Sequence, residues 1–376
     1  MNAFSRTFHL VTTAKLPLLL MTLAVVFGCD QRDGEQYLLG HIAPLSGANR
    51  EAGQQSQRGV QLAVEECNAE SKNWIGGRKV AALHADSASE AKTAGGQSIR
   101  LVTVNHADAL IGSMSAAEAV QINTTAREYS LVAINGAGVI DPAPNASFSI
   151  GRSDIDRARA VDRFLVEQLK PKNVAIVVDG KDSTWSSLVD ELARLGRARN
   201  VFAEQFQVFK DDDVSKAAAR FGNYAGTIIV AAPARQFLKL RELLIKDGQL
   251  PEMIFVGDDG ERDQIVASAD QAYLVGGCFV NRGETYDQFA GRFFKRFGVL
   301  PTAEAIAGYD STRILLSAAR EVGGFHPQKL RDKLASLGEF DAVIGKLTMG
   351  ADHFAHGPTF IVQVDAGKQV IKQRYD

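Results

Sequence analysis

The sequence predicts an α/β protein built from two lobes, each a doubly wound parallel sheet. Short apolar runs of strand length alternate with amphipathic helical patterns along most of the chain. This alternation restarts near residue 153. The chain of 376 residues is also long enough for two domains of ordinary size. Alternating strands and helices favour right-handed βαβ units, so we expect two such sheets in succession.

The first half of the chain supplies the elements of the first sheet. Its strand-like runs are residues 37–44, 79–86, 108–113 and 130–136. The helical patterns between them are residues 53–70, 89–105 and 115–128. In the first of these helices, an apolar face is formed by Val60, Leu62, Ala63, Val64 and Cys67.

The second half repeats the pattern. Its strand-like runs are residues 173–178, 227–232 and 253–258, and its helical patterns are residues 184–196 and 234–247. A doubly wound sheet binds ligands beyond the carboxyl ends of its strands. The turns that follow such ends are residues 44–53, 112–116, 135–139, 179–185 and 257–261. Two lobes with these edges facing each other would form a ligand-binding cleft.

The N-terminal segment has the features of a secretory signal. Residues 1–15 contain Arg6 and Lys15 but no acid, and residues 16–28 are apolar. This stretch is shorter than the roughly 20 residues that an ordinary membrane-spanning helix needs. We therefore interpret residues 1–28 as a signal peptide, the alternative being a core helix.

The sequence "VVFGC" at the end of this segment resembles a bacterial lipobox, although Phe27 is bulky for its position. The resemblance implies that Cys29 is lipidated, which would make residues 29–36 a tether to the membrane. Asp30 directly after such a cysteine implies retention at the inner membrane of a Gram-negative cell, in the periplasm.

Composition and motifs argue against several function classes. A net charge of -2 offers no basic excess for nucleic acid. The chain lacks HExxH, GxSxG and GxGxxG, and "DGKDST" fails the phosphate-loop spacing because Ala175 stands where a glycine is required. We therefore expect neither an enzyme nor a bound cofactor.

Metal sites are not expected either. His353 and His356 are interpreted as loop histidines in preference to metal ligands. Residues 210–216 are interpreted as a solvated loop with acids near a helix N-terminus, in preference to a calcium loop. Cys67 and Cys278 lie far apart without a CxxC pattern. They are interpreted as two separate buried thiols, with a disulfide as the alternative.

Seven segments of the sequence form a recognisable series: "HIAPLSGANREAGQQSQRGVQLAVEECNA", "GGRKV", "DALIGSMSA", "KPKNVAIVVDG", "GDDGERD", "FKRFGVLPTAEAIAGYD" and "FDAVIGKLTMGADHFAHGPTFIVQV". In their order and spacing they resemble the type I periplasmic binding proteins, closest to the leucine/isoleucine/valine-binding branch that serves ABC importers. The resemblance implies three crossovers between the lobes, near residues 153, 281 and 341. Lobe 1 would contain residues 37–153 and 282–341, and lobe 2 residues 154–281 and 342–376. The cleft between them would close around the ligand by a hinge motion.

The same resemblance implies a carboxylate-binding turn at residues 112–116. Ser115, with Ser113 as its neighbour, would present a hydroxyl to the carboxylate of a bound amino acid, and Ala116 a backbone N–H. Independently of the family, a helix N-terminus has unsatisfied donors and a positive dipole end that favour an anion. The alternative is that Ser113 or Ser115 only caps the helix.

Three further contacts are implied by the resemblance. Gly136, Ala137 and Gly138 match a segment whose backbone meets the ligand, without the family's threonine hydroxyl; they are alternatively turn residues only. Asp259 in "GDDG" would receive the ligand's ammonium group, with Asp258 adjacent; a solvated turn or helix cap is the alternative. Trp185 would be a stacking lid over the ligand, or else pack between helices.

Departures from the family pattern bear on the ligand. Ala52 stands where many relatives have an aromatic residue, and Pro233 or Ala234 replaces an expected tyrosine. An amino acid remains the expected ligand; an amide, urea, a small carboxylate or an aromatic acid are alternatives. The expected function is a tethered receptor with ABC permease subunits as partners. A ligand sensor on the same fold is the second function considered.

Overall fold

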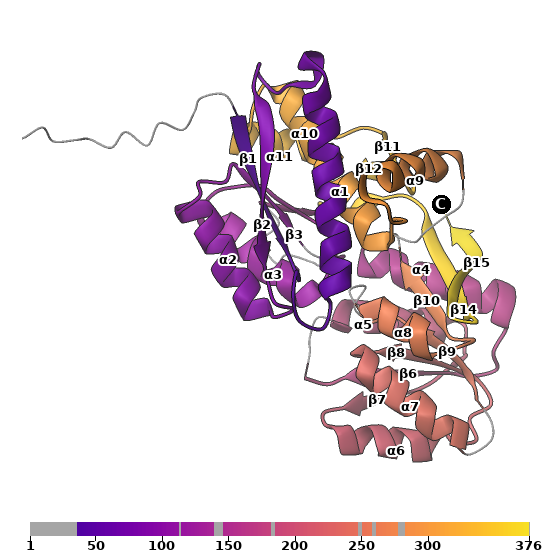
Figure 1. The fold of residues 1–376 in the computed structure, drawn as a ribbon. Helices are drawn as coiled ribbons and strands as arrows, with labels where there is room; N and C mark the ends of the chain where they lie inside the picture. Colours follow the sequence, from indigo (N-terminus) through magenta and orange to yellow (C-terminus); the bar gives the residue numbers. More distant parts are fainter. Residues whose placement is uncertain are drawn as a thin grey trace, which may run out of the picture. The chain divides into compact units, whose positions relative to one another are not determined.

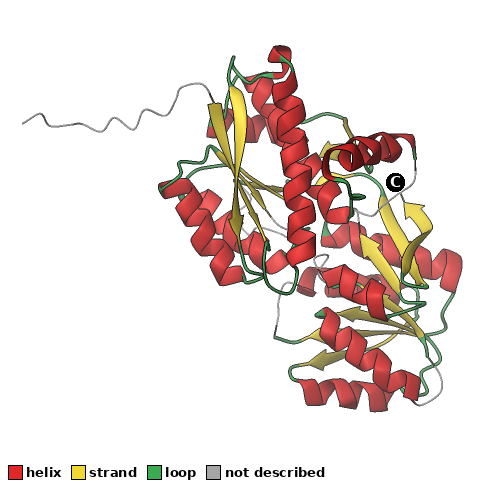
Figure 2. Cartoon of the chain, viewed as in Figure 1, coloured by secondary structure: helices red, strands yellow, loops and turns green. Residues whose placement is uncertain are grey.

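The computed structural model describes residues 36–112, 114–138, 146–181, 185–246, 250–257, 261–276 and 283–375. Within these ranges the strands form three sheets, of five, seven and three strands. Figure 1 labels the elements and Figure 2 colours them by type. The expected signal peptide, Cys29 and most of the expected tether lie outside the described residues.

The first sheet is entirely parallel and has the strand order β2-β1-β3-β4-β5. Its strands are β1 (Gln36–Ala43), β2 (Lys79–Asp86), β3 (Ala109–Gly112), β4 (Ala133–Asn135) and β5 (Ser147–Ser149). The helices of this part of the chain are α1 (Arg50–Ala69), α2 (Ala91–Thr103) and α3 (Ala116–Glu128), with a short 3-10 turn, η1 (Ser71–Asn73).

Helices cover both faces of this sheet, and Figure 1 shows α1 on one side and α2 with α3 on the other. Because side chains alternate along a strand, Ile111 lies in one apolar cluster and its neighbour Leu110 in the other. The first cluster also receives three later helices, α9 (Glu284–Phe297), α10 (Ala303–Val322) and α11 (Pro327–Ala335). Burial on both faces explains why these strands are continuous apolar runs in the sequence.

Helices α1 and α10 pack backbone against backbone. A Cβ atom placed on Gly59 would lie 2.1 Å from the carbonyl oxygen of Ala305 and 2.9 Å from the amide nitrogen of Tyr309. Only a residue without a side chain allows this approach. The close packing brings the N-terminal end of α10 beside α1, although more than 200 residues separate them in sequence.

The second sheet has the order β15-β14-β10-β9-β8-β6-β7. Its parallel strands are β6 (Val174–Asp179), β7 (Phe202–Val208), β8 (Thr227–Ala231), β9 (Glu252–Phe255) and β10 (Tyr273–Gly276), and its antiparallel strands are β14 (Thr359–Asp365) and β15 (Lys368–Tyr375). The helices that cover it are α4 (Asp154–Phe164), α5 (Ser186–Ala198), α6 (Asp211–Phe221), α7 (Ala234–Lys246) and α8 (Arg262–Ser268), together with a π-helical turn, η2 (Leu165–Leu169).

This sheet also has an apolar cluster on each face. Val177 and Val230 pack with α6, α7 and α8, whereas Ile176 and Ile229 pack with α4 and α5. The acids predicted to stand at a helix N-terminus are Asp211, Asp212 and Asp213, which form the first turn of α6. Their place at a helix N-terminus is confirmed, and carboxylates are favoured at that positive end of a helix. The predicted loop is wrong, because residues 211–216 belong to α6.

The chain passes between the two sheets near β5 and again before β14. Ser149 bridges to Phe354, and the buried guanidinium of Arg152 donates to the carbonyl oxygens of Ala355 and Pro358, the latter at 3.2 Å. The third crossover was expected near residue 341. Residues 342–355, which include β12 (Gly345–Met349) of the small sheet, still contribute to the first sheet's core, and the chain joins the second sheet only at Thr359.

The small sheet is formed by β11 (Phe340–Ala342), β12 and β13 (Ala355–His356). The predicted fold class, two doubly wound parallel-sheet lobes, is confirmed. None of the helices within the described ranges is long and apolar enough to cross a membrane.

Candidate functional site

A small hollow lies at the carboxyl edge of the first sheet, where β1, β3 and β4 are neighbours and end together. Its volume is about 20 Å³. It is lined by Ala43, Pro44, Asn49, Ala52, Gly53, Ser56, Met114, Ser115 and Glu304. The lining therefore comes from the loop after β1, the start of α1, the turn before α3 and the first turn of α10. This is the edge at which doubly wound sheets bind ligands.

Ser115 is the predicted contact that the structure places in this lining. It precedes the first residue of α3, Ala116, and its backbone is extended, with φ of -77° and ψ of 125°. Its side chain makes no capping hydrogen bond to the helix. The capping alternative is therefore wrong for Ser115. Ser113 lies outside the described residues.

The predicted backbone contact, residues 136–138, lies next to the hollow but not in its lining. Gly136 and Ala137 are buried, and the carbonyl oxygen of Ala137 accepts a hydrogen bond from the hydroxyl of Ser149. A Cβ atom on Gly138 would lie 2.2 Å from the carbonyl oxygen of Arg152. Close packing against the chain that leaves the first sheet thus accounts for this glycine, in agreement with the turn alternative.

On the second sheet, Trp185 lies just before α5, and only 6% of its surface is exposed. Its indole packs in the apolar cluster shared with Leu188 and Val178. The structure thus places it between elements of its own core, as the packing alternative proposed. Its Nε1 atom has no hydrogen-bond partner among the described residues.

Asp258 and Asp259 lie outside the described residues, but the backbone on both sides of their turn is held in place. Arg157, which is buried, donates to the carbonyl oxygens of Val256 at 2.5 Å and Gly257 at 3.0 Å. After the turn, a carboxylate oxygen of Glu261 accepts a hydrogen bond of 2.6 Å from the backbone N–H of Ala234, at the start of α7.

Glu304 is a residue of this site that the sequence prediction missed. It stands in the first turn of α10 and is 5% exposed. The hydroxyl of Thr302 donates to its Oε2 atom at 2.6 Å. Burial, followed by the carboxylate of Asp263 on α8, raises the pKa of Glu304 to about 7, although Thr302, the backbone N–H of Glu304 and Arg262 oppose the rise.

One signal for Glu304 was visible in the sequence. In "PTAEAIAGYD" it is the single acid before Asp310 in an otherwise small and apolar run. Buried acids are rare unless they are paired or functional. Its proximity to Ser115 could not be predicted, because it depends on the packing of α1 against α10.

Ser56 belongs to a buried polar chain behind the hollow. Its hydroxyl lies 3.1 Å from Nε2 of His41, and Nδ1 of His41 lies 2.9 Å from Nδ1 of His84. Burial and the neighbouring His84 hold the pKa of His41 well below its usual value, and burial lowers the pKa of His84 to about 4. Both imidazoles are therefore neutral at pH 7, so they position Ser56 without adding charge.

The first loop of the site is fixed by a single carboxylate. Asp86, the last residue of β2, accepts hydrogen bonds from the backbone N–H groups of Leu45 at 2.9 Å and Ser46 at 3.0 Å, and from the hydroxyl of Ser46 at 2.6 Å. These contacts hold the segment that leads from Pro44 to α1.

The residues considered as metal ligands have other partners. His353 stacks on Phe148 with ring centroids 4.3 Å apart, and Nε2 of His356 lies 3.1 Å from a carboxylate oxygen of Asp352. Across the described ranges, no three His, Cys, Asp or Glu side chains are grouped to hold a metal ion. Cys67 is a free, buried thiol, and Cys278 lies outside the described residues.

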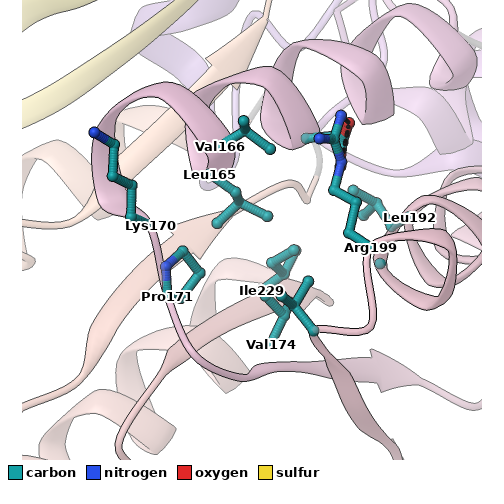
Figure 3. A pocket seen from close by; sticks show the side chains of 11 residues that line it. Leu165, Val166, Lys170, Pro171, Val174, Leu192, Arg199 and Ile229 are labelled. Carbon is teal, nitrogen blue, oxygen red and sulfur yellow. Dashed lines mark hydrogen bonds and ion pairs between the residues drawn. The ribbon is translucent and has the colours of Figure 1, made fainter.

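A larger cavity, of about 300 Å³, lies at the amino end of β6 and is a poor candidate for a polar ligand (Figure 3). Figure 3 shows Leu165, Val166, Val174 and Ile229 around it, with Arg199 at its edge. The guanidinium of Arg199 is already paired with Asp162, at 2.6 Å between Nη2 and Oδ2. The predicted ligand contacts that the structure describes are absent from its lining.

Comparison with known proteins gives consistent results. The sequence profile of the periplasmic binding protein family matches residues 36–369. An amino acid binding protein from Pseudomonas aeruginosa is 24% identical over 339 residues, which cover 85% of this chain and 87% of that protein.

Solved structures share the fold. A leucine binding protein from Thermotoga maritima has a TM-score of 0.78 at 16% identity and covers 90% of this chain and 98% of its own. An ABC transporter solute binding protein from R. palustris, in complex with benzoate, has a TM-score of 0.73 at 19% identity, with 90% and 96% covered. Because the family profile spans nearly the whole described chain, this protein belongs to the periplasmic binding protein family.

Proposed function

We propose that this chain is the substrate-binding subunit of an ABC importer and captures a small polar solute, an amino acid, outside the cytoplasm. The observation that carries the proposal is the position of Ser115. Its hydroxyl makes no cap to α3, and the residue lines a hollow at the sheet edge beside the N-terminal end of that helix, where backbone N–H groups and the positive end of the helix dipole lie. A carboxylate is the group that such an arrangement favours.

The relatives support an organic acid or amino acid as cargo. One is named an amino acid binding protein, and the R. palustris structure holds benzoate. We place Asp259, from the second lobe, at the ammonium end of the ligand, so that the ligand links the two lobes. Trp185 is the least supported contact, because its indole packs in the core of its own sheet.

The proposal extends to the N-terminus and the partners. A lipid on Cys29 would hold the protein at the inner membrane, where it can deliver its ligand to permease subunits. Acyl chains contribute about 0.8 kcal/mol per buried CH₂ group, so more than one chain is a firm tether. A sensor that signals to another protein when the lobes close is the alternative; genes for permeases and ATPases beside this one would favour the importer.

Two substitutions test the site. A charge-assisted hydrogen bond contributes about 1.5 to 3 kcal/mol, so Ser115→Ala and Asp259→Ala should each raise the Kd of the amino acid at least about tenfold. Ser268→Ala and Asp365→Ala, at exposed positions, are matched controls and should leave the Kd unchanged. Calorimetric titration of the folded variants measures the effect. Unchanged Kd values in both site variants would refute the assignment.

A further inference from the structure

The hollow beside Ser115 has the size of one small polar group. Its volume of about 20 Å³ compares with the roughly 10 to 15 Å³ that a single water requires. An ammonium group has similar dimensions. Glu304 contributes the only carboxylate among the residues that line it, and Ser56 and Ser115 contribute hydroxyls.

The charges around Glu304 are predominantly negative. Asp263 on α8 acts on Glu304 directly, and Glu51 on α1 acts on Asp263 in turn. The one cation that opposes these acids is Arg262, whose effect on Glu304 is smaller than that of Asp263. Burying a carboxylate is costly unless it is paired with a cation or well hydrogen-bonded. Among the described residues, Thr302 and the backbone N–H of Glu304 supply hydrogen bonds to this carboxylate, and Arg262 supplies the opposing charge.

We propose that Glu304 is the acceptor for a primary ammonium group of the ligand. This inference rests on the proposed function and deepens it. In an α-amino acid the ammonium and carboxylate groups are attached to the same carbon atom. The hollow lined by Glu304 and Ser115 therefore receives the ammonium group, and the carboxylate on the same carbon atom lies at the rim, directed to the N-terminal end of α3.

This arrangement defines the ligand class and the role of each lobe. The first sheet's lobe recognises the amino acid head, which leaves the ligand's side chain to contact the second lobe. Acids without an amine are then poor ligands, because they leave Glu304 without its cation. The inference thus assigns the ammonium group to Glu304 in place of Asp259.

The experiment compares amino acids with their deamino analogues. The probe pairs are leucine with 4-methylpentanoate, phenylalanine with 3-phenylpropanoate, and glutamate with glutarate, each titrated by calorimetry into the wild type, Glu304→Gln and Asp259→Asn. Gln retains an acceptor for the Thr302 hydroxyl, so the substitution preserves the fold; thermal unfolding verifies this. In the wild type, at least one amino acid should bind at least about tenfold more tightly than its analogue.

The three outcomes separate this inference from the proposed function. Loss of that preference in Glu304→Gln, with the preference retained in Asp259→Asn, supports the ammonium site at Glu304. If the preference is instead lost only in Asp259→Asn, or if deamino analogues bind as well as amino acids, the inference is refuted while the receptor function stands. If no probe binds at millimolar concentration, the proposed function fails, and this inference fails with it.

The dependence of affinity on pH provides a second readout. An ammonium ligand requires ionised Glu304 and displaces its proton, so affinity should rise with pH between about 5 and about 7, by at most about tenfold per unit. Glu304→Gln lacks the titrating carboxyl group and should flatten this pH dependence. The other charged groups that face residue 304, Asp263 and Arg262, are still present in that variant. A fall in affinity with rising pH would indicate that protonated Glu304 holds a carboxylate, and would overturn the proposal.

Discussion

Raising the pH of the ligand-free protein should lower its free energy of unfolding, because Glu304 then loses its proton in the folded state. The pKa of a glutamate side chain is ordinarily 4.5, the value taken for the unfolded chain. In the folded protein the pKa of Glu304 is about 7, mainly because the side chain is buried. Between these values the folded state binds a proton that the unfolded state has released. The free energy of unfolding is therefore highest below the unfolded pKa, falls as the pH rises towards 7, and is level above it.

The size of this effect follows from the shift. Each pKa unit corresponds to 1.36 kcal/mol, so Glu304 should account for a loss of about 3 kcal/mol between pH 4.5 and 7. Asp310 acts in the same direction, since burial raises its pKa from 3.8 to about 7 against the hydrogen bonds from the backbone of Val343 and Ile344. As the pH rises to 7, the free energy of unfolding of the wild type should fall through both Glu304 and Asp310. That of Glu304→Gln should fall through Asp310 alone.

Urea unfolding of the wild type and Glu304→Gln across this pH range measures the two contributions. Titrating groups distant from residue 304 are common to both proteins and cancel in the difference, whereas Asp263, which interacts with Glu304, contributes to it. The variant should become more stable relative to the wild type as the pH rises. Parallel pH profiles would refute the reasoning, because they would mean that Glu304 titrates as an exposed acid.

Two further substitutions test the packing of α1. Gly59→Ala forces a methyl group against the carbonyl oxygen of Ala305 and should lower the free energy of unfolding, measured in urea, by about 1 to 3 kcal/mol. The control Gly291→Ala, in α9 with open space around it, should be neutral or stabilising. Equal effects of the two substitutions would refute the close approach of the helices. Glu65→Gln breaks an ion pair of 2.8 Å with Arg296, in which both side chains are more than a third exposed. The free energy of unfolding should fall by less than about 1 kcal/mol, and by still less at high salt. A loss of several kcal/mol would contradict the assignment of this pair to the surface.

The fold could be predicted because its elements carry local signals. Strands buried on both faces, such as residues 227–231, are continuous apolar runs, and the helix of residues 186–198 has a clear apolar face. β7 was missed because its apolar and polar residues alternate at the edge of the second sheet. β5 was missed because three residues form too short a pattern.

The site was only partly predictable, because local and long-range features contribute to it differently. Ser115 stands between a strand and a helix, where its sequence neighbours allow a helix cap or a ligand contact, and the family resemblance favoured the contact. Glu304 reaches the same hollow only because α10 packs on α1 through Gly59. Trp185 follows a strand end as expected, yet the core of its own sheet buries the indole. Sequence order does not determine such packing choices.

The central claim, that this protein is a receptor for a small amino acid, is tested most directly by thermal unfolding of residues 30–376 with and without ligands. The protein is stripped of any carried ligand and heated with amino acids, amides, urea and small carboxylates in turn. A ligand present at about 100 times its Kd adds about 2.7 kcal/mol to the folded state. We predict that one class of amino acids raises the unfolding midpoint accordingly. A midpoint unchanged by every amino acid would contradict the account.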